Sequence, residues 1–185
     1  MGVQLPPALL KDLEDVKGFD KEAFITVHQS EAQITSVRIN PAKVRPENKE
    51  QFLSKSQLSV QESIPWSQYG FYLEKRPSFT FDPLFHAGAY YVQEASSMFL
   101  EQALMQTADL DKNLTVLDLC AAPGGKSTHL QSLIPPDSLL VSNEVIKTRA
   151  GVLRQNIIKW GRSNVVVTNN DPQHFARLGG FFDVM

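Results

Sequence analysis

The stretch LDLCAAPGGKSTHL, residues 117–130, combines a cysteine, a glycine pair and a lysine. A cysteine can act as a nucleophile, and glycines before a lysine can form a loop that binds phosphate. A phosphate-binding P-loop requires Gly, four residues and then Gly-Lys-Ser or Gly-Lys-Thr. Gly125, Lys126 and Ser127 supply the end of that pattern, but Cys120 stands where the first glycine is required. The residues therefore disfavour a nucleotide triphosphatase.

The small residues of this stretch predict a tight turn whose backbone a ligand can approach closely. The adjacent glycines do not match the Gly-x-Gly-x-x-Gly fingerprint of dinucleotide-binding proteins. One predicted strand ends at Glu144, 18 positions after Lys126, and the next ends at Asp171. Such acids can accept hydrogen bonds from ribose hydroxyls and from the adenine amine, respectively. Either acid alone is better explained as a helix cap or turn residue, but the two together indicate a bound adenosine. Because the sequence has no phosphate-binding loop beside them, the indicated ligand is S-adenosylmethionine.

The residues after about position 113 must position these groups, and their pattern is regular. Apolar strands are predicted over 114–119, 138–144 and 164–171, with helices over 125–134 and 146–160 between them. Strands that alternate with helices indicate a parallel sheet with right-handed crossovers and helices on both faces. Residues 181–185, FFDVM, resemble the start of a fourth strand. Because a complete sheet of this kind has about six strands, we expect the front part of a longer protein, with apolar surface and a sheet edge exposed.

The first part of the chain predicts a mixed arrangement. Its expected segments are helices over 7–16, 20–28 (capped by Asp20), 46–59 and 94–106, and strand-like pieces over 33–40, 65–74 and 85–93. We therefore expect an α/β fold, with an incomplete Rossmann-like parallel sheet preceded by a small α+β N-terminal subdomain. The expected division is 1–83 for the subdomain and 84–185 for the first half of a cofactor-binding domain.

The composition, 42% hydrophobic and 21% charged among 185 residues, is that of an ordinary globular protein. No apolar run approaches the roughly 18 residues of a membrane span, and the N-terminus lacks a secretory signal. A single cysteine and four histidines without metal-like spacing predict no disulfide and no metal, which fits a cytoplasmic protein.

The charge is unevenly distributed. Residues 1–111 hold 10 Lys and Arg against 15 Asp and Glu, a net charge of −5, whereas residues 112–185 hold 8 against 5, a net charge of +3. The basic residues of one predicted helix and its exit are Lys147, Arg149, Arg154, Lys159 and Arg162. On charge alone, a solvated helix face is favoured over a surface that binds nucleic acid.

The stretch 117–130 closely resembles the S-adenosylmethionine loop of the RNA 5-methylcytosine methyltransferases, a family of bacterial ribosomal RNA enzymes and their eukaryotic nucleolar relatives. Further segments resemble the family's other elements in the family's order: TSVRINPAK (35–43), IPWSQYGFYLE (64–74), FHAGAYYVQEASSM (85–98) and the run from Asn143 to Asp171. The resemblance covers nearly the whole chain. It is nearest to the small-subunit ribosomal RNA enzymes.

The resemblance implies roles for individual residues. The residues implied to line the methionine and ribose side of the cofactor are Cys120, Ala121, Ala122, Pro123, Gly124, Gly125 and Lys126. Glu144 is implied to bind the ribose hydroxyls and Asp171 the adenine amine. Arg149 matches a position near the cofactor, with a helix-surface salt bridge as an equal alternative.

The resemblance also covers residues whose roles stay open. Gln93, Glu94 and Ser97 match an element packed beside the cofactor pocket, where their role could be purely structural. Arg38 and Asn40 match an N-terminal element, and either RNA contact or fold support is compatible with them.

The family attacks cytosine C6 with a cysteine thiolate, and a second cysteine assists release of the product. Those cysteines lie in an Asp-x-Pro-Cys loop after the fourth strand and in a later Thr-Cys loop. Cys120 belongs to neither, so we expect it to fill a tight bend and we expect no catalytic residue in residues 1–185. The implied substrate is a base in unpaired or opened small-subunit ribosomal RNA. The full-length enzyme would be a monomer and this part alone inactive; the alternative is a non-catalytic relative that binds RNA or an adenosine ligand.

Overall fold

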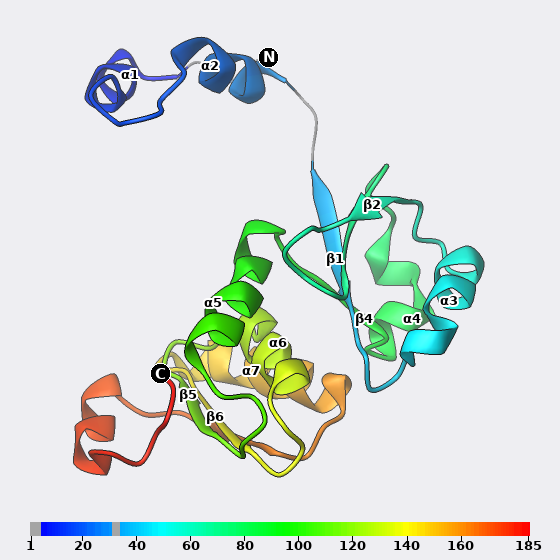
Figure 1. Cartoon of the computed structure of the whole chain (residues 1–185), viewed down its shortest axis with the longest axis vertical. Coiled ribbons are helices and arrows are strands. Elements are labelled where there is room, and N and C mark those ends of the chain that lie inside the picture. Colours follow the sequence, from blue (N-terminus) through cyan, green and yellow to red (C-terminus); the bar gives the residue numbers. More distant parts are fainter. Residues whose placement is uncertain (1–4, 31–33) are drawn as a thin grey trace. The chain divides into compact units, whose positions relative to one another are not determined.

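The computed structural model describes residues 5–30 and 34–185, which divide into one unit up to Ile34 and a second from Thr35 (Figure 1). The first unit holds α1 (Pro7–Leu13) and α2 (Lys21–Gln29). The Asp20 side chain accepts a hydrogen bond from the Ala23 N–H at 2.9 Å, so the predicted cap is confirmed. The start of the predicted strand over 33–40, at Gln33, and the first four residues of the chain lie outside the described residues.

The second unit begins with an antiparallel sheet. Its strands are β1 (Thr35–Ile39), β2 (Val60–Ser63), β3 (Gly70–Leu73) and β4 (Tyr90–Val92), in the order β2-β3-β1-β4. All five residues of β1 are buried, because β1 is paired on both sides: Val37 lies opposite Phe71 and opposite Val92. β1 is therefore the central support of this sheet.

Short helices close the antiparallel sheet around an apolar core. The predicted helix over 46–59 is a 3₁₀ turn, η1 (Pro46–Asn48), followed by α3 (Lys49–Lys55). The chain then forms η2 (Phe79–Phe81) and α4 (Pro83–His86), neither of which was predicted. The core that these elements cover includes Val37, Ile39, Leu58, Phe71, Leu73, Phe79 and Tyr90. The Asp82 carboxylate caps α4 and accepts a hydrogen bond from the Tyr90 hydroxyl at 2.6 Å.

A second, parallel sheet contains β5 (Thr115–Asp118), β6 (Leu139–Asn143) and β7 (Val165–Thr168), in the order β5-β6-β7. Leu117, Val141 and Val166 are aligned across the three strands. The predicted fourth strand is present only as an isolated parallel bridge between Val184 and Val116. The carboxyl ends of β5, β6 and β7 consequently lie at one edge, where parallel sheets bind ligands.

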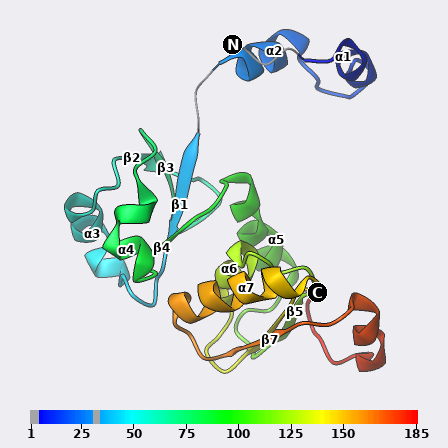
Figure 2. The same cartoon turned by 180° about the vertical axis from the view of Figure 1, so that it is seen from behind.

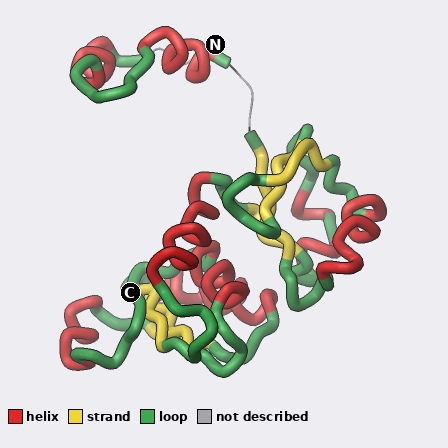
Figure 3. Tube along the Cα trace, viewed as in Figure 1, coloured by secondary structure: helices red, strands yellow, loops and turns green. Residues whose placement is uncertain are grey.

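Helices η3 (Ser96–Phe99) and α5 (Leu100–Thr107) precede this sheet, and α6 (Gly125–Leu133) and α7 (Lys147–Trp160) connect its strands. A further 3₁₀ segment, η4 (Pro172–Leu178), follows β7. Figures 2 and 3 show the strands beside α5, α6 and α7. Because the strand order advances in one direction, right-handed crossovers place α6 and α7 on the same face, where they contact each other. The structure thus differs from the expectation of helices on both faces, and Val166 is 48% exposed.

The expected fold class, a Rossmann-like α/β sheet after an α+β subdomain, is confirmed. Both sheets belong to the unit from Thr35 to Met185, and β4, which follows the expected boundary between 83 and 84, pairs with β1. That boundary stays a prediction. Among residues 5–30 and 34–185, no helix is long and apolar enough to cross a membrane.

Candidate ligand-binding site

The glycine pair lies where the turn between β5 and α6, residues 119–124, meets the first residue of α6. Gly124 has a φ of +112°, in the region that residues with a Cβ rarely adopt, and a Cβ there would lie 3.2 Å from Leu153. Gly125 begins α6, and a Cβ there would lie 3.4 Å from the Tyr91 ring. The turn therefore requires a glycine at position 124, whereas a Cβ at position 125 would make an ordinary contact with β4.

The turn forms one wall of a pocket of about 300 Å³. Residues 120–123, Gly125 and Lys126 line one side, and residues 91–94 with Ser97 line the other. Six of the seven turn residues predicted from the sequence thus line the pocket. They lie opposite the segment QEASS, residues 93–97, of which Gln93, Glu94 and Ser97 line the other side. Cys120 is an exposed free thiol in this wall.

Glu144 follows β6 and is only 3% exposed. Its Oε1 accepts a hydrogen bond from the Ile146 N–H at 3.0 Å, and its Oε2 lies 3.4 Å from Arg149 Nη1. Arg149 Nη2 also donates to the Ala122 carbonyl at 2.7 Å. Arg149 therefore forms a salt bridge, as one alternative expected, and joins the acid to the turn as well.

Asp171 lies three residues after the end of β7 and is exposed. Its Oδ1 accepts a hydrogen bond from the Gln173 N–H at 2.8 Å and so caps η4. Both predicted acids thus have the ordinary turn role that the sequence left open. In each acid a single oxygen makes that turn hydrogen bond.

Asn143, which sequence reasoning missed, ties the strand ends together. It is 0% exposed; its Nδ2 donates to the carbonyls of Leu119 (3.2 Å) and Asn170 (2.9 Å), and its Oδ1 accepts from Thr168 Oγ1 (2.9 Å) and the Asn170 N–H (2.9 Å). The side-chain amide of Asn143 therefore joins the end of β6 to the segment after β5 and to the end of β7. An asparagine directly before the predicted acid is the only signal that the sequence offered for it.

Asp118, the last residue of β5, was also missed. Burial raises the pKa of its carboxyl, although the Ser127 hydroxyl, which donates to it at 2.6 Å, opposes this shift. Ser and Thr side chains in a helix can donate to a backbone carbonyl one turn earlier. Thr128 does so, to the Gly124 carbonyl at 2.8 Å, but Ser127 instead joins α6 to β5.

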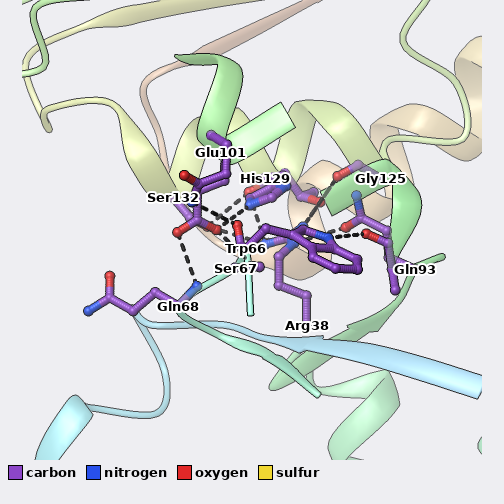
Figure 4. A network of polar contacts seen from close by, with 12 residues as sticks. Arg38, Trp66, Ser67, Gln68, Gln93, Glu101, Gly125, His129 and Ser132 are labelled. Atoms are coloured by element: carbon purple, nitrogen blue, oxygen red, sulfur yellow. Dashed lines mark hydrogen bonds and ion pairs between the residues drawn. The ribbon is translucent and has the colours of Figure 1, made fainter. Parts of the chain in front are cut away.

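Arg38 is the centre of a buried polar network beneath the pocket (Figure 4). It is 1% exposed; Nε donates to Gln93 Oε1 at 2.9 Å, and Nη2 donates to Thr128 Oγ1 at 2.7 Å and to the Gly125 carbonyl at 3.3 Å. The guanidinium also lies 4.5 Å from the centre of the Trp160 ring. Burial lowers the pKa of Arg38 to about 9, so it remains charged at neutral pH. Of the two roles left open for Arg38, these contacts are those of fold support.

Asn40 has the same role. It is 0% exposed, and its Nδ2 donates to the carbonyls of Gly88 at 2.9 Å and Trp160 at 2.8 Å, while its Oδ1 accepts from the Ala42 N–H at 3.0 Å. Asn40 therefore joins the end of β1 to the end of α7.

A second buried pair lies in the same network. His129 Nε2 and Glu101 Oε2 are 3.1 Å apart, and Glu101 also accepts hydrogen bonds from the Ser67 hydroxyl (2.8 Å) and the Gln68 N–H (3.1 Å). Burial lowers the pKa of His129. Burial pushes the pKa of Glu101 upward, but His129, Gln68 and Ser67 hold it below its usual value. Both pKa shifts agree with a neutral His129 whose Nε2–H donates to an ionised Glu101. His129 does not line the pocket.

Within the described part of the chain, no three His, Cys, Asp or Glu side chains converge as metal ligands would. The chemistry offered at the sheet edge is instead a glycine turn, a buried acid after β6 and an exposed acid after β7. This is the arrangement by which Rossmann-like domains bind an adenosine group.

Solved structures define the class of protein. The methyltransferase homolog protein from Pyrococcus horikoshii is 28% identical, with a TM-score of 0.74, over 97% of this chain and 62% of that one. NSun6 from the same organism, determined with SFG, has the same fold: it is 16% identical, with a TM-score of 0.74, over 94% of this chain and 67% of that one. The fold is that of a methyltransferase.

The family is defined by sequence. Residues 5–95 match the N-terminal domain of 16S rRNA methyltransferase RsmF, and residues 105–185 match 16S rRNA methyltransferase RsmB/F. The chain belongs to this RsmB/RsmF family of 16S rRNA methyltransferases. This confirms the family resemblance found in the sequence.

Named relatives are longer than this chain. It is 34% identical to ribosomal RNA small subunit methyltransferase F from Pectobacterium atrosepticum, over 98% of this chain and 38% of that protein. It is also 34% identical to the enzyme of the same name from Psychromonas ingrahamii, over 89% of this chain and 34% of that protein. The chain thus spans little more than a third of the length of these two relatives.

Proposed function

We propose that this chain is the N-terminal and cofactor-binding part of an S-adenosylmethionine-dependent RNA cytosine-C5 methyltransferase that acts on small-subunit ribosomal RNA. The observation that carries the proposal is the match of both halves of the chain, in order, to one methyltransferase family. The names of the relatives support the substrate, and the shared fold of NSun6, determined with the S-adenosylmethionine analogue SFG, supports the cofactor.

The turn 120–126 would lie against the methionine and ribose side of the cofactor, Glu144 would accept from the ribose hydroxyls and Asp171 from the adenine amine. The residues fit such a ligand. Glu144 is a buried carboxylate, and among residues 5–30 and 34–185 its Oε2 has only the 3.4 Å contact with Arg149, so it can still accept a hydrogen bond. Arg149 would orient Glu144 and the turn together. The cofactor supplies the methyl group, and the protein supplies position and shape.

The nucleophile of such an enzyme is proposed to lie outside residues 1–185. Cys120 is part of the turn wall, beside Ala121, whose N–H donates to the Asn143 carbonyl at 2.8 Å. This fixed backbone suits Cys120 to cofactor contact and not to attack on a base. The coverage of only 38% of the first relative leaves ample sequence for catalytic cysteines.

The two functions of such an enzyme are proposed to divide along the sequence. Residues 1–83 would serve the RNA side and residues 84–185 the cofactor side, in a protein that acts as a monomer. The target cytosine must leave its stack for C6 to be attacked, so an unpaired or opened segment of RNA is the proposed substrate.

Binding of S-adenosylhomocysteine to the full-length protein tests the cofactor site. We expect Glu144→Gln to weaken binding by roughly tenfold, or about 1.4 kcal/mol, in isothermal titration, because it removes the charge that accepts the ribose hydroxyls. Asp137→Asn, at an exposed acid before β6, is the matched control and should bind normally. Tight magnesium-dependent ATP binding that is lost in Lys126→Ala would instead support a nucleotide triphosphatase.

A methyl-transfer assay, added to the binding titration, separates the enzyme from a binding protein. A non-catalytic relative would bind S-adenosylhomocysteine with the same dependence on Glu144, yet its full-length form would transfer no methyl group to RNA.

A further inference from the structure

Gln93, directly after β4, is a buried side chain with half of its hydrogen-bonding capacity unused. It is 7% exposed, and its Oε1 accepts the bond from Arg38 Nε at 2.9 Å, but its Nε2 has no hydrogen-bond partner among the described residues. The arginine Nε–H can only donate, so the amide oxygen must face Arg38 and the NH₂ group must face away from it. A buried amide donor without an acceptor is unfavourable, so Gln93 requires an explanation.

The position of Gln93 is fixed by its neighbours. Its backbone N–H donates to the Ser36 carbonyl at 3.2 Å, and its carbonyl accepts from the Ser36 hydroxyl at 2.6 Å. Its amide carbon would lie 3.8 Å from a Cβ placed on Gly125, and Figure 4 shows Gln93 between Arg38 and Gly125. The amide is therefore held rigidly against the start of α6, in the wall of the pocket.

The other polar groups of the wall complement this donor. The first turn of α6 contains no acid, and no side chain caps it at Gly124, so its free N–H groups favour an anion. Lys126 adds a positive charge, and Glu94 supplies one exposed carboxylate. A wall that has many donors and one carboxylate matches a zwitterionic α-amino acid, which carries a carboxylate and an ammonium group.

We propose that Gln93 Nε2 binds the carboxylate at the amino-acid end of the cofactor, and that Glu94 receives its ammonium group. This inference rests on the proposed function, because an adenosine held by Glu144 and Asp171 directs the other end of the molecule to the turn. An RNA phosphate could use the same donors, but it would be repelled by Glu94. Arg38 acts as a positioning residue, since it fixes which way the amide points.

The test compares two ligands that differ at this end. S-adenosylhomocysteine carries the amino-acid group, and 5′-methylthioadenosine lacks it. In Gln93→Glu an oxygen still faces Arg38, but an oxygen replaces the Nε2 donor and repels a carboxylate. We expect the full-length variant to bind S-adenosylhomocysteine at least tenfold more weakly and 5′-methylthioadenosine as the unaltered protein does. Gln155→Glu, the same change on the exposed face of α7, should alter neither affinity.

Other results have defined meanings. Equal loss for both ligands, or no loss for either, would overturn the role of Gln93, as would a loss of RNA binding with S-adenosylhomocysteine binding intact. If the unaltered protein binds neither nucleoside, the proposed function itself fails. A thermal melt verifies that Gln93→Glu is folded. If that variant is unfolded, Glu94→Gln, at an exposed acid, replaces it. For the proposal to stand, Glu94→Gln must weaken the binding of S-adenosylhomocysteine but not that of 5′-methylthioadenosine.

Discussion

Arg38 and Arg149 both contact the turn between β5 and α6, but from different parts of the molecule. Arg38, on β1, donates to the Gly125 carbonyl at 3.3 Å, and Arg149, on α7, donates to the Ala122 carbonyl at 2.7 Å. Arg38 is 1% exposed, whereas the side chain of Arg149 is 52% exposed. Both looked alike in the sequence, as basic residues in segments that resemble one family.

The difference in burial separates two functions of the same chemical group. The bonds from Arg38 to Gln93 and Thr128 are buried, so its charge is used within the fold. Arg149 pairs with Glu144 at the edge where a ligand would lie, and water can replace its contacts. Arg38, on the antiparallel sheet, thus supports the start of α6 from within the protein, and Arg149, on α7, stays accessible at the end of the parallel sheet.

The largest loss of stability is expected for Arg38→Ala. Removal of the guanidinium leaves Gln93 Oε1 and Thr128 Oγ1 buried without this donor, and we expect the free energy of unfolding to fall by about 3 kcal/mol or more. Arg149→Ala should lower it by less than about 1 kcal/mol. Urea denaturation of the full-length protein measures both. Equal losses would mean that burial does not distinguish the two arginines.

Arg149→Ala tests whether this arginine supports ligand binding. Because Arg149 holds Glu144 and the turn together, its loss should weaken S-adenosylhomocysteine binding by roughly fivefold, or about 1 kcal/mol, while the protein stays folded. Titration at matched temperature measures this. Unchanged affinity would show that Arg149 is only a surface ion pair.

A smaller effect concerns pH and the pair His129–Glu101. The pKa of folded His129 lies below 6.5, so between that pKa and 6.5 the unfolded chain binds more protons, and stability must fall as the pH drops through this window. The lowered pKa of Glu101 acts in the same direction below 4.5. Urea midpoints between pH 7 and 5 should therefore decrease, and His129→Gln should flatten the decrease. His174→Gln, at an exposed histidine, should leave the slope unchanged.

The smallest effect is expected for Cys120→Ala. The thiol is exposed, so the free energy of unfolding should change by no more than about 0.5 kcal/mol. Methyl transfer by the full-length variant should stay within about twofold of the unaltered enzyme. Abolished transfer with the fold intact would make Cys120 a catalytic residue after all.

The parallel sheet was predictable because its strands are nearly continuous apolar runs and its helices follow glycine and polar turns. β2 was missed because VQES, at the sheet edge, is polar and largely exposed, so nothing in its pattern separates it from a loop. The isolated bridge at Val184 reflects the same limit: FFDVM has the composition of a strand, but pairing depends on neighbours as well as composition.

The candidate site was predictable where residue type and strand position suffice, as at Glu144 and in the turn. Gln93 and Asn143 could not be assigned in this way. Arg38 lies 55 positions before Gln93, and the partners of Asn143 lie 24 to 27 positions from it. Which polar side chains become buried, and which atoms they leave free, is decided by packing between distant segments.

The most direct test of the proposed function is methyl transfer by the full-length protein. Small-subunit ribosomal RNA from cells that lack this gene is incubated with the protein and S-adenosylmethionine labelled in its methyl group, and the modified nucleoside is identified by mass spectrometry. We expect 5-methylcytidine, formed more slowly at limiting S-adenosylmethionine by Glu144→Gln but not by Asp137→Asn. Labelled RNA without 5-methylcytidine, or no transfer by a folded protein that binds the cofactor, would contradict it.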